Sequence, residues 1–266
     1  MTISEEWAAL SETMYGEPFI AELADWLARR GVRTVLECGC GGGHILEGLA
    51  RYGFTGLGID ADLEMIAIAK VRHPHPAIEF RQLNWLKIDW LEEMYDAVIS
   101  RGNSLAYTAG WPVPTPDANP RQLIEQSLAS MFDKIKPGGL LYVDTISQSE
   151  LEQGDHLAEI VLPCIRLTGQ IEYSQGQMTR TIYGSGTVHG DPFAGKSVCY
   201  LLSPDELQRM MAKLKPAKII KPQLATETNY HAICAVKTKR LRRRTDGSER
   251  TIRSPKGENL RGFLYS

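Results

Sequence analysis

A glycine-rich run follows the first strongly apolar stretch of this 266-residue chain. The run begins at Glu37 and ends at Gly43, has the sequence ECGCGGG, and stands between a predicted strand and a predicted helix. Glycine allows a tight turn and lets a ligand approach main-chain atoms without interference from a Cβ atom. We therefore predict that Gly39, Cys40 and Gly41 contact a cofactor that lies across the strand ends.

The spacing of these glycines favours S-adenosylmethionine over a dinucleotide. A dinucleotide-binding loop has the spacing GxGxxG, and His44 occupies the position of its third glycine. Charge favours the same cofactor, because the carboxylate of Glu37 would repel a pyrophosphate but attract an ammonium and a sulfonium. The sequence predicts S-adenosylmethionine as the cofactor, and a dinucleotide or a turn without a ligand are the alternatives.

Polar residues also follow the next two apolar runs. Asp60 is at the position where a carboxylate commonly accepts hydrogen bonds from both ribose hydroxyls of a nucleoside. The next residue, Ala61, is also predicted to contact the cofactor. The alternative is that Asp60 only caps a helix that begins near Ala61. Asn84 is predicted to contact the edge of the adenine ring, and the indole of Trp85 is predicted to cover its face. The alternative for Trp85 is that its side chain packs in the hydrophobic core.

Short apolar runs alternate with amphipathic stretches between residues 32 and 143, which is typical of strand–helix units around a parallel sheet. The predicted strands are 34–37, 56–59, 77–83, 95–100 and 140–144, and the predicted helices are 18–30, 44–51, 63–72 and 120–134. We therefore expect an α/β, Rossmann-like fold with helices on both faces of the sheet.

The pattern changes after residue 144, where Val, Ile, Thr and Tyr are separated by glycine and polar turns. This composition predicts a small antiparallel insertion at approximately 158–202, with strands within 160–171, 178–188 and 197–202. A helix with a serine cap is predicted to open at Ser203. Strands at 217–224 and 230–236 would then complete the main sheet.

The last 30 residues, 237–266, are basic, with ten Lys/Arg against three Asp/Glu. They contain too little apolar surface to offset the entropy of ordering, so we expect a flexible tail. The net charge of −2 for the whole chain gives no general case for a nucleic-acid partner, although this tail leaves RNA open. A solvated extension is the alternative for the tail.

Other classes of protein are not indicated by the composition. No apolar run approaches the ~20 residues that a helix needs to span a bilayer, and the N-terminus lacks the pattern of a signal peptide. The five cysteines show no zinc-ligand spacing, so we assign no metal. We expect a cytoplasmic enzyme without a membrane partner.

Three blocks of the chain resemble the glycine N-methyltransferase family, within the class I S-adenosylmethionine-dependent methyltransferases. These blocks are the glycine-rich loop, Asn84–Asp89, and Tyr95–Tyr107 with its Gly-Asn-Ser triplet, while Lys136–Leu141 resembles a turn common to the superfamily. The resemblance covers about Tyr15 to Val236. It implies a methyltransferase domain over residues 1–236, with a seven-stranded, mostly parallel sheet and a small antiparallel lid.

The resemblance also implies roles for individual side chains. Asn103 would position a small amino substrate near the methyl group, and Tyr107 would face the cofactor. Tyr183 and Tyr200 would contribute hydroxyls from the lid strands, and Tyr15 would lie near the site from the N-terminal side. Ordinary sheet packing is the alternative for Tyr183 and Tyr200.

The chain departs from that family at two positions. The family carries an arginine after the fifth strand that holds the substrate carboxylate, whereas this chain has Asp144-Thr145-Ile146-Ser147 there, so glycine itself is not the expected acceptor. No arginine matches the family's contact to the methionine carboxylate, and Arg101 or backbone groups are the candidates for that role.

The sequence thus predicts an enzyme that methylates a small polar molecule, by N-methylation of an amine or an amino-acid-like acceptor. The alternatives are small-molecule O- or C-methylation, an RNA-binding methyltransferase that uses the basic tail, and a non-catalytic nucleotide-binding protein. Relatives in the family are often oligomeric, so a homo-oligomer is a further expectation.

Overall fold

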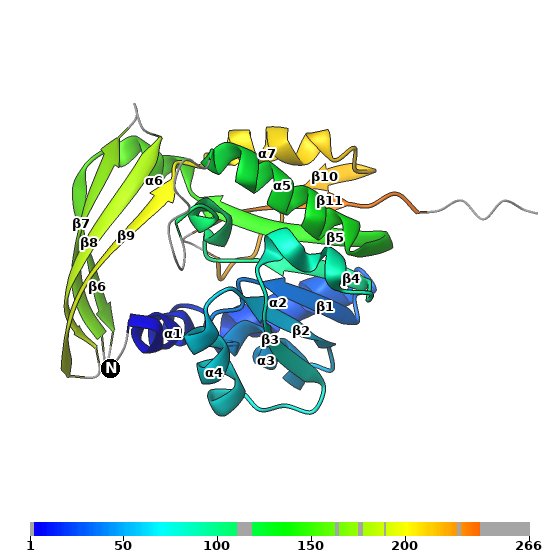
Figure 1. Ribbon diagram of the computed structural model, residues 1–266, viewed down its shortest axis with the longest axis horizontal. Helices are drawn as coiled ribbons and strands as arrows, with labels where there is room; N and C mark the ends of the chain where they lie inside the picture. Colours follow the sequence, from blue (N-terminus) through cyan, green and yellow to red (C-terminus); the bar gives the residue numbers. More distant parts are fainter. Residues whose placement is uncertain are drawn as a thin grey trace, which may run out of the picture.

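The computed structural model describes residues 3–110, 119–162, 165–174, 178–188, 190–227 and 230–239. Two separate sheets organise the chain (Figure 1). The larger has seven strands, which in spatial order are β10 (Lys218–Ile220), β11 (Tyr230–Val236), β5 (Ile135–Ile146), β4 (Tyr95–Ser100), β1 (Thr34–Cys38), β2 (Thr55–Asp60) and β3 (Ile78–Gln82). The pairs that involve β11 are antiparallel, and the other pairs of this sheet are parallel.

Helices cover both faces of this sheet. The helices that cover it are α2 (Glu17–Ala28), α3 (His44–Arg51), α4 (Leu63–Arg72), α5 (Pro120–Asp133) and α7 (Pro204–Lys213). The structure also describes α1 (Ile3–Met14), α6 (Gln148–Gln153) and the short 3₁₀ helices η1 (Trp85–Trp90) and η2 (Ser104–Tyr107). Alternate residues of the central strands face two cores, one with α2, α3 and α4 and the other with α5 and α7. The predicted α/β, doubly covered sheet is confirmed.

The ends of α2 follow the sequence signals used to predict it. Pro18 lies in the first turn, where its missing N–H leaves no intrahelical bond unmade, and Gly31 has a φ of +77° just beyond the end. The capped helix predicted at Ser203 is also present, because the Ser203 side chain accepts a hydrogen bond from the Glu206 N–H (3.2 Å).

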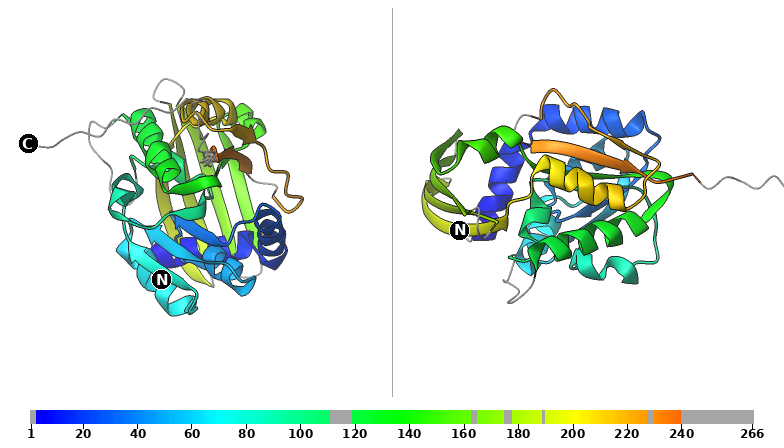
Figure 2. Two further views of the ribbon diagram at one scale, coloured as in Figure 1. Left: turned by 90° about the vertical axis from the view of Figure 1, so that its right-hand side faces the viewer. Right: turned by 90° about the horizontal axis from the view of Figure 1, so that it is seen from above.

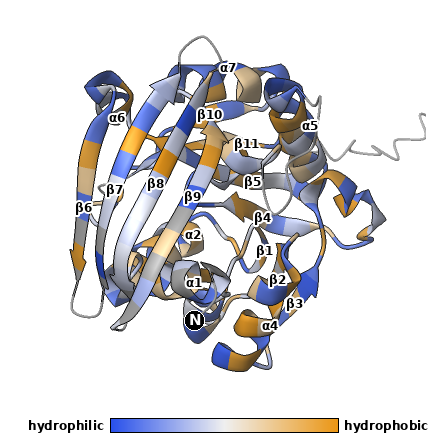
Figure 3. Ribbon diagram, turned by 60° about the vertical axis from the view of Figure 1, so that its left-hand side comes forward, coloured by the Kyte–Doolittle hydropathy of each residue, from blue (hydrophilic) through white to orange (hydrophobic). Residues whose placement is uncertain are grey.

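The second sheet, here named the lid sheet, consists of the antiparallel strands β6 (His156–Leu162), β7 (Ile165–Ser174), β8 (Thr179–Val188) and β9 (Asp191–Tyr200). The predicted stretch 160–171 contains the end of β6 and most of β7, so the sequence indicated three strands where there are four. Polar and apolar residues are mixed along these strands (Figure 3).

The lid sheet stands at one end of the core, and α1 lies between the two (Figure 2). Neither α1 nor α6 was predicted from the sequence. Residues 111–118 lie outside the described residues, as does the basic tail beyond Lys239. Among the helices that the structure describes, none combines the length and apolar content required to cross a bilayer.

Candidate cofactor and acceptor site

The glycine-rich loop lies at the carboxyl edge of the parallel strands. Gly39, Gly41 and Gly43 have φ values of +74°, +51° and +86°, which glycine adopts without the strain that a Cβ atom brings. The N–H groups of Gly39 and Cys40 both donate to the carbonyl of Ile59, at 2.8 and 3.0 Å. The loop is thereby fixed against the end of β2.

Gly39 and Gly41 differ in the space that surrounds them. A Cβ atom added at Gly39 would lie 2.8 Å from the indole of Trp85, so this ring packs directly on the loop. A Cβ atom added at Gly41 would meet nothing within 4 Å. The missing side chains therefore serve two purposes, because one admits Trp85 and the other leaves main-chain atoms open to a ligand.

Glu37 is the most unusual residue beside the loop. It is the last but one residue of β1, its side chain is 2% exposed, and one carboxyl oxygen, Oε2, is buried without a hydrogen-bond partner. Burial raises the pKa of Glu37 to about 8. A buried acceptor that lacks a donor is suited to a cationic ligand group, and it indicates that the ammonium of S-adenosylmethionine fits this position.

Asp60 lies across the loop from Glu37. Its Oδ2 accepts from the Gly41 N–H and its Oδ1 from the Asp62 N–H, both at 2.9 Å, and burial raises its pKa. Asp62 rather than Asp60 caps α4, because the Asp62 side chain accepts from the Glu64 N–H. The alternative assignment of Asp60 as only the cap of that helix is therefore wrong, and its predicted contact with the ribose stays a prediction.

The other residues predicted to contact the nucleoside border the same edge. The side-chain oxygen of Asn84 accepts from the Leu86 N–H (2.9 Å) and caps η1, which leaves its NH2 group as the part not used by the cap. The carbonyl of Ala61 accepts from Gln82 Nε2 (3.1 Å). Asn84 and Trp85 are consecutive, so they occupy one side of the loop together.

Asn103 is held at the end of β4 by the end of β5. The N–H groups of Gly102 and Asn103 donate to the two carboxyl oxygens of Asp144, at 3.1 and 2.8 Å, and Thr145 Oγ1 donates to Asn103 Oδ1 (3.0 Å). Asn103 is 3% exposed and has a φ of +60°. This clamp fixes the amide in one orientation at the edge where the loop lies.

Arg101 lies in a buried cluster of charges. Its guanidinium contacts the carboxylates of Asp144 (3.2 Å) and Glu227, and Nη1 donates to the Tyr142 hydroxyl (2.8 Å). Burial lowers the pKa of Arg101, but Asp144 and the other anionic neighbours raise it more, so that the net pKa lies well above the ordinary value. The predicted contact of Arg101 with the methionine carboxylate stays a prediction, and these contacts favour a structural role.

A group of tyrosines faces this edge of the sheet. Tyr15 is 6% exposed, its ring lies 6.4 Å from that of Tyr230, and the hydroxyls of the two side chains form a hydrogen bond. The Tyr15 hydroxyl lies within 3.5 Å of the position that a Cβ atom on Gly102 would take, beside Asn103. Sequence reasoning did not find Tyr230, because it reads as an ordinary residue of a strand.

The lid sheet adds a buried cation to this group. Arg180, in β8, is 8% exposed and pairs in register with the buried Cys199 of β9. Burial raises the pKa of Tyr107, and both Arg180 and a hydrogen bond with Ser197 oppose that rise, so Tyr107 faces the lid sheet rather than solvent. The sequence gave no signal for Arg180 beyond its place in a predicted strand.

The structure does not bring Tyr183 into this group. Tyr183 follows Arg180 by three residues, so the two side chains leave opposite faces of β8, and Tyr183 is 39% exposed beside Lys196. The predicted role of Tyr183 in acceptor binding is not supported by this placement. Tyr200 is buried, but its hydroxyl donates to Glu206 of α7 (3.2 Å), so it joins the lid sheet to the core.

The N-terminal helix α1 closes over the glycine-rich loop. A Cβ atom added at Gly42 would lie 2.8 Å from the Cβ of Ala8, and Ser4 Oγ donates to the Asp62 carboxylate (3.1 Å). The His44 ring lies 2.7 Å from the carbonyl of Tyr15, which joins the segment after α1 to the start of α3. The N-terminal segment therefore forms one wall of the site.

Residues 35–139 match a protein-family model described as a methyltransferase domain. This segment of the chain is similar to a methyltransferase domain. Curated relatives include ubiquinone biosynthesis O-methyltransferases from Brucella anthropi (27% identical over 43% of this chain and 42% of that protein) and Chelativorans sp. (30% over 43% and 41%). The matched segments thus span only about two fifths of the length of these relatives.

Solved structures with the same fold cover more of the chain. A methyltransferase from Clostridium acetobutylicum superposes with a TM-score of 0.68 at 11% identity, covering 90% of this chain and 100% of that one. DesVI from Streptomyces venezuelae gives 0.70 at 15% (90% and 99%), and an amino pentose methyltransferase from Micromonospora echinaspora gives 0.66 at 16% (82% and 90%). The predicted class I methyltransferase fold is confirmed, and the narrower resemblance to glycine N-methyltransferases stays a prediction.

Proposed function

We propose that this protein transfers the methyl group of S-adenosylmethionine to a nitrogen atom of a small polar acceptor, an amine or an amino-acid-like molecule. The observation that carries the proposal is the glycine-rich loop between two buried carboxyl groups, Glu37 and Asp60, with an unpaired oxygen on Glu37. The segment similar to a methyltransferase domain, residues 35–139, includes all of these residues.

The residues around the loop are suited to separate parts of this cofactor. Glu37 would accept from the ammonium, Asp60 from the ribose hydroxyls, and Asn84 and Trp85 would contact the adenine edge and face. When bound, the cofactor supplies a methyl group on a positively charged sulfur, which makes that carbon reactive toward a lone pair. The protein then needs to orient the acceptor, exclude water and keep the acceptor's lone pair available.

The acceptor side of the proposed site combines hydroxyls, an amide and a buried cation from the lid sheet. Tyr15, Tyr230 and Asn103 gather beside the loop, and Arg180 approaches Tyr107 from the lid sheet. A nearby positive charge lowers the pKa of an amine, because it disfavours the protonated form. Arg180 would thus favour the neutral, nucleophilic amine, which supports an N-methyltransferase that needs no separate base.

The names of the curated relatives favour O-methylation as a second candidate. A hydroxyl acceptor must lose its proton, so this reaction would benefit from a general base at the site. His231 is a half-buried histidine whose pKa is lowered by burial and by Lys221, but it directly follows Tyr230 on β11, so its side chain lies on the opposite face of the strand, on the side of Asp205. That placement favours the amine acceptor.

A turnover screen tests the proposal directly. Purified protein is incubated with S-adenosylmethionine and pools of amines, amino acids and small hydroxy acids, and formation of S-adenosylhomocysteine is measured. We expect turnover with an amine pool and none with hydroxy acids. Turnover with hydroxy acids alone would replace N-methylation by O-methylation, and calorimetric binding of NAD without binding of S-adenosylhomocysteine would overturn the proposal altogether.

A further inference from the structure

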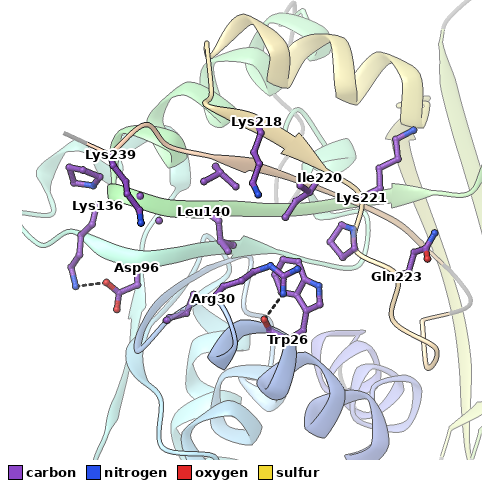
Figure 4. A pocket seen from close by; sticks show the side chains of 17 residues that line it. Trp26, Arg30, Asp96, Lys136, Leu140, Lys218, Ile220, Lys221, Gln223 and Lys239 are labelled. Carbon is purple, nitrogen blue, oxygen red and sulfur yellow. Dashed lines mark hydrogen bonds and ion pairs between the residues drawn. The ribbon is translucent and has the colours of Figure 1, made fainter. Parts of the chain in front are cut away.

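A cavity of about 630 Å³ lies at the edge of the sheet opposite the proposed methyl-transfer site (Figure 4). It is lined by the residues just before β1, by the start of β4 at Asp96, by the turn at Gly138, and by β10. The amino ends of the parallel strands meet at this edge, whereas the glycine-rich loop follows their carboxyl ends. A ligand in this cavity would therefore be separate from the cofactor.

The lining of the cavity is strongly basic. Five cationic side chains line it against one acid, Asp96, and they are Arg30, Lys136, Lys218, Lys221 and Lys239. Lys136 pairs with Asp96 at 2.9 Å, so the acid is already neutralised by one of them. The lining as a whole keeps an excess of four positive charges.

This excess contrasts with the charge of the rest of the domain. The segment from Lys237 to the last residue carries ten of the 30 Lys/Arg and three of the 32 Asp/Glu, so residues 1–236 carry 20 and 29, a net charge of −9. Four of the cations that line the cavity belong to those 236 residues. Like charges repel at short range, so an anion bound between these cations would relieve their mutual repulsion.

The side chains also converge on the cavity. Figure 4 shows Lys218 and Lys239 extending from the strands on one side toward Arg30 on the other, whereas Lys221 turns away. The stem of Lys239 lies over Gly138, 2.9 Å from the position that a Cβ atom would take, where φ is +87°. A side chain at position 138 would displace Lys239, so this glycine keeps the ammonium beside the cavity.

We propose that this basic cavity binds phosphate groups, either of a nucleotide or of a nucleic-acid backbone. Its volume lies within the range of small-ligand sites, about 300–1,000 Å³, and ammonium and guanidinium groups are the usual partners of phosphate oxygens. The chain that leaves the cavity at Lys239 continues with Arg240, Leu241 and three further arginines, which extends the positive charge in sequence.

Fluorescence anisotropy of the full-length protein tests this proposal. The probe is a labelled 12-nucleotide single-stranded RNA, titrated at several salt concentrations, with ATP and inorganic tripolyphosphate as competitors. For Lys218→Gln/Lys239→Gln we expect weaker binding and a slope of log K against log[salt] shallower by about 1.4, which is about 0.7 for each lost phosphate contact. The exposed pair Lys70→Gln/Arg166→Gln makes the same change of charge outside the cavity and should leave binding and slope unchanged.

The competitors distinguish a nucleotide from a nucleic-acid backbone as the source of the bound phosphate groups. Binding of RNA that tripolyphosphate displaces supports a nucleic-acid backbone in the cavity, and binding of ATP or tripolyphosphate without RNA supports a nucleotide. A second full-length variant, with residues 242–244 changed to glutamine, measures the contribution of the basic tail. The proposal is overturned if no probe binds at 50 mM salt, roughly where non-specific phosphate contacts remain strong, or if only the tail variant loses binding.

Discussion

Replacing Glu37 by glutamine tests the contact on which cofactor binding is proposed to depend. Glu37 is 2% exposed and its pKa is raised to about 8, so in the free protein it is mostly protonated at pH 7. An ammonium group requires the ionised form, whose fraction rises from about 1% at pH 6 to about 9% at pH 7 for a pKa near 8. The ammonium of the ligand, with an ordinary pKa of about 7.7–8.0, stays largely protonated over this range.

The dissociation constant of S-adenosylhomocysteine should therefore fall about tenfold between pH 6 and pH 7, because one pKa unit corresponds to a tenfold change in equilibrium constant. Calorimetry in buffers of different ionisation enthalpy should detect a net release of about 0.8 proton at pH 7, because Glu37 loses about 0.9 and the ligand amine takes up about 0.1. In Glu37→Gln both effects should disappear, and the exposed Glu92→Gln should retain them. A dissociation constant of the unmodified protein that does not change between pH 6 and pH 7 would refute the assigned contact.

The same carboxyl group predicts the dependence of stability on pH. Between the ordinary pKa of a glutamate and about 8, the folded protein holds a proton on Glu37 that the unfolded chain has released. The free energy of unfolding should thus decrease as the pH rises from 5 to 8, and Glu37→Gln should reduce this decrease. Asp144, whose burial raises its pKa to about 6, contributes in the same direction at the lower end of the range.

The remaining predictions concern the acceptor side and the buried charges. Asn103→Gly removes the amide but tolerates the φ of +60°, so kcat should fall by tenfold or more in the turnover assay while the affinity for S-adenosylhomocysteine changes little. Arg101→Met leaves two buried carboxylates without a cation and should lower the free energy of unfolding in urea by about 3–5 kcal/mol. Arg180→Gln should move the acidic limb of the pH profile of kcat to higher pH, because the bound amine would keep its proton longer. Tyr183→Phe should leave kcat and KM unchanged, since its side chain lies on the opposite face of the lid sheet.

Local sequence patterns were sufficient for the core of the fold and for the position and conformation of the glycine-rich loop. The strands around Glu37 and Asp60, and the glycines between them, follow from short-range rules: apolar alternation, helix caps, and positive φ values that glycine alone adopts readily. These rules act between residues that are close in the chain. A single sequence therefore contains the information that they need.

Tertiary structure decided which side chains meet. Tyr183 and Arg180 are three residues apart in one strand, so their side chains lie on opposite faces of the lid sheet. Only the packing of this sheet beside Tyr107 shows that Arg180 lies on the face toward the core and Tyr183 on the other face. The pairing of Arg101 with Asp144 and Glu227 joins segments 43 and 126 residues apart. Such contacts depend on how whole strands and helices pack. The same packing buries the ionisable side chains and thereby sets their pKa values, so the charge state of Glu37 could not be predicted from the sequence alone.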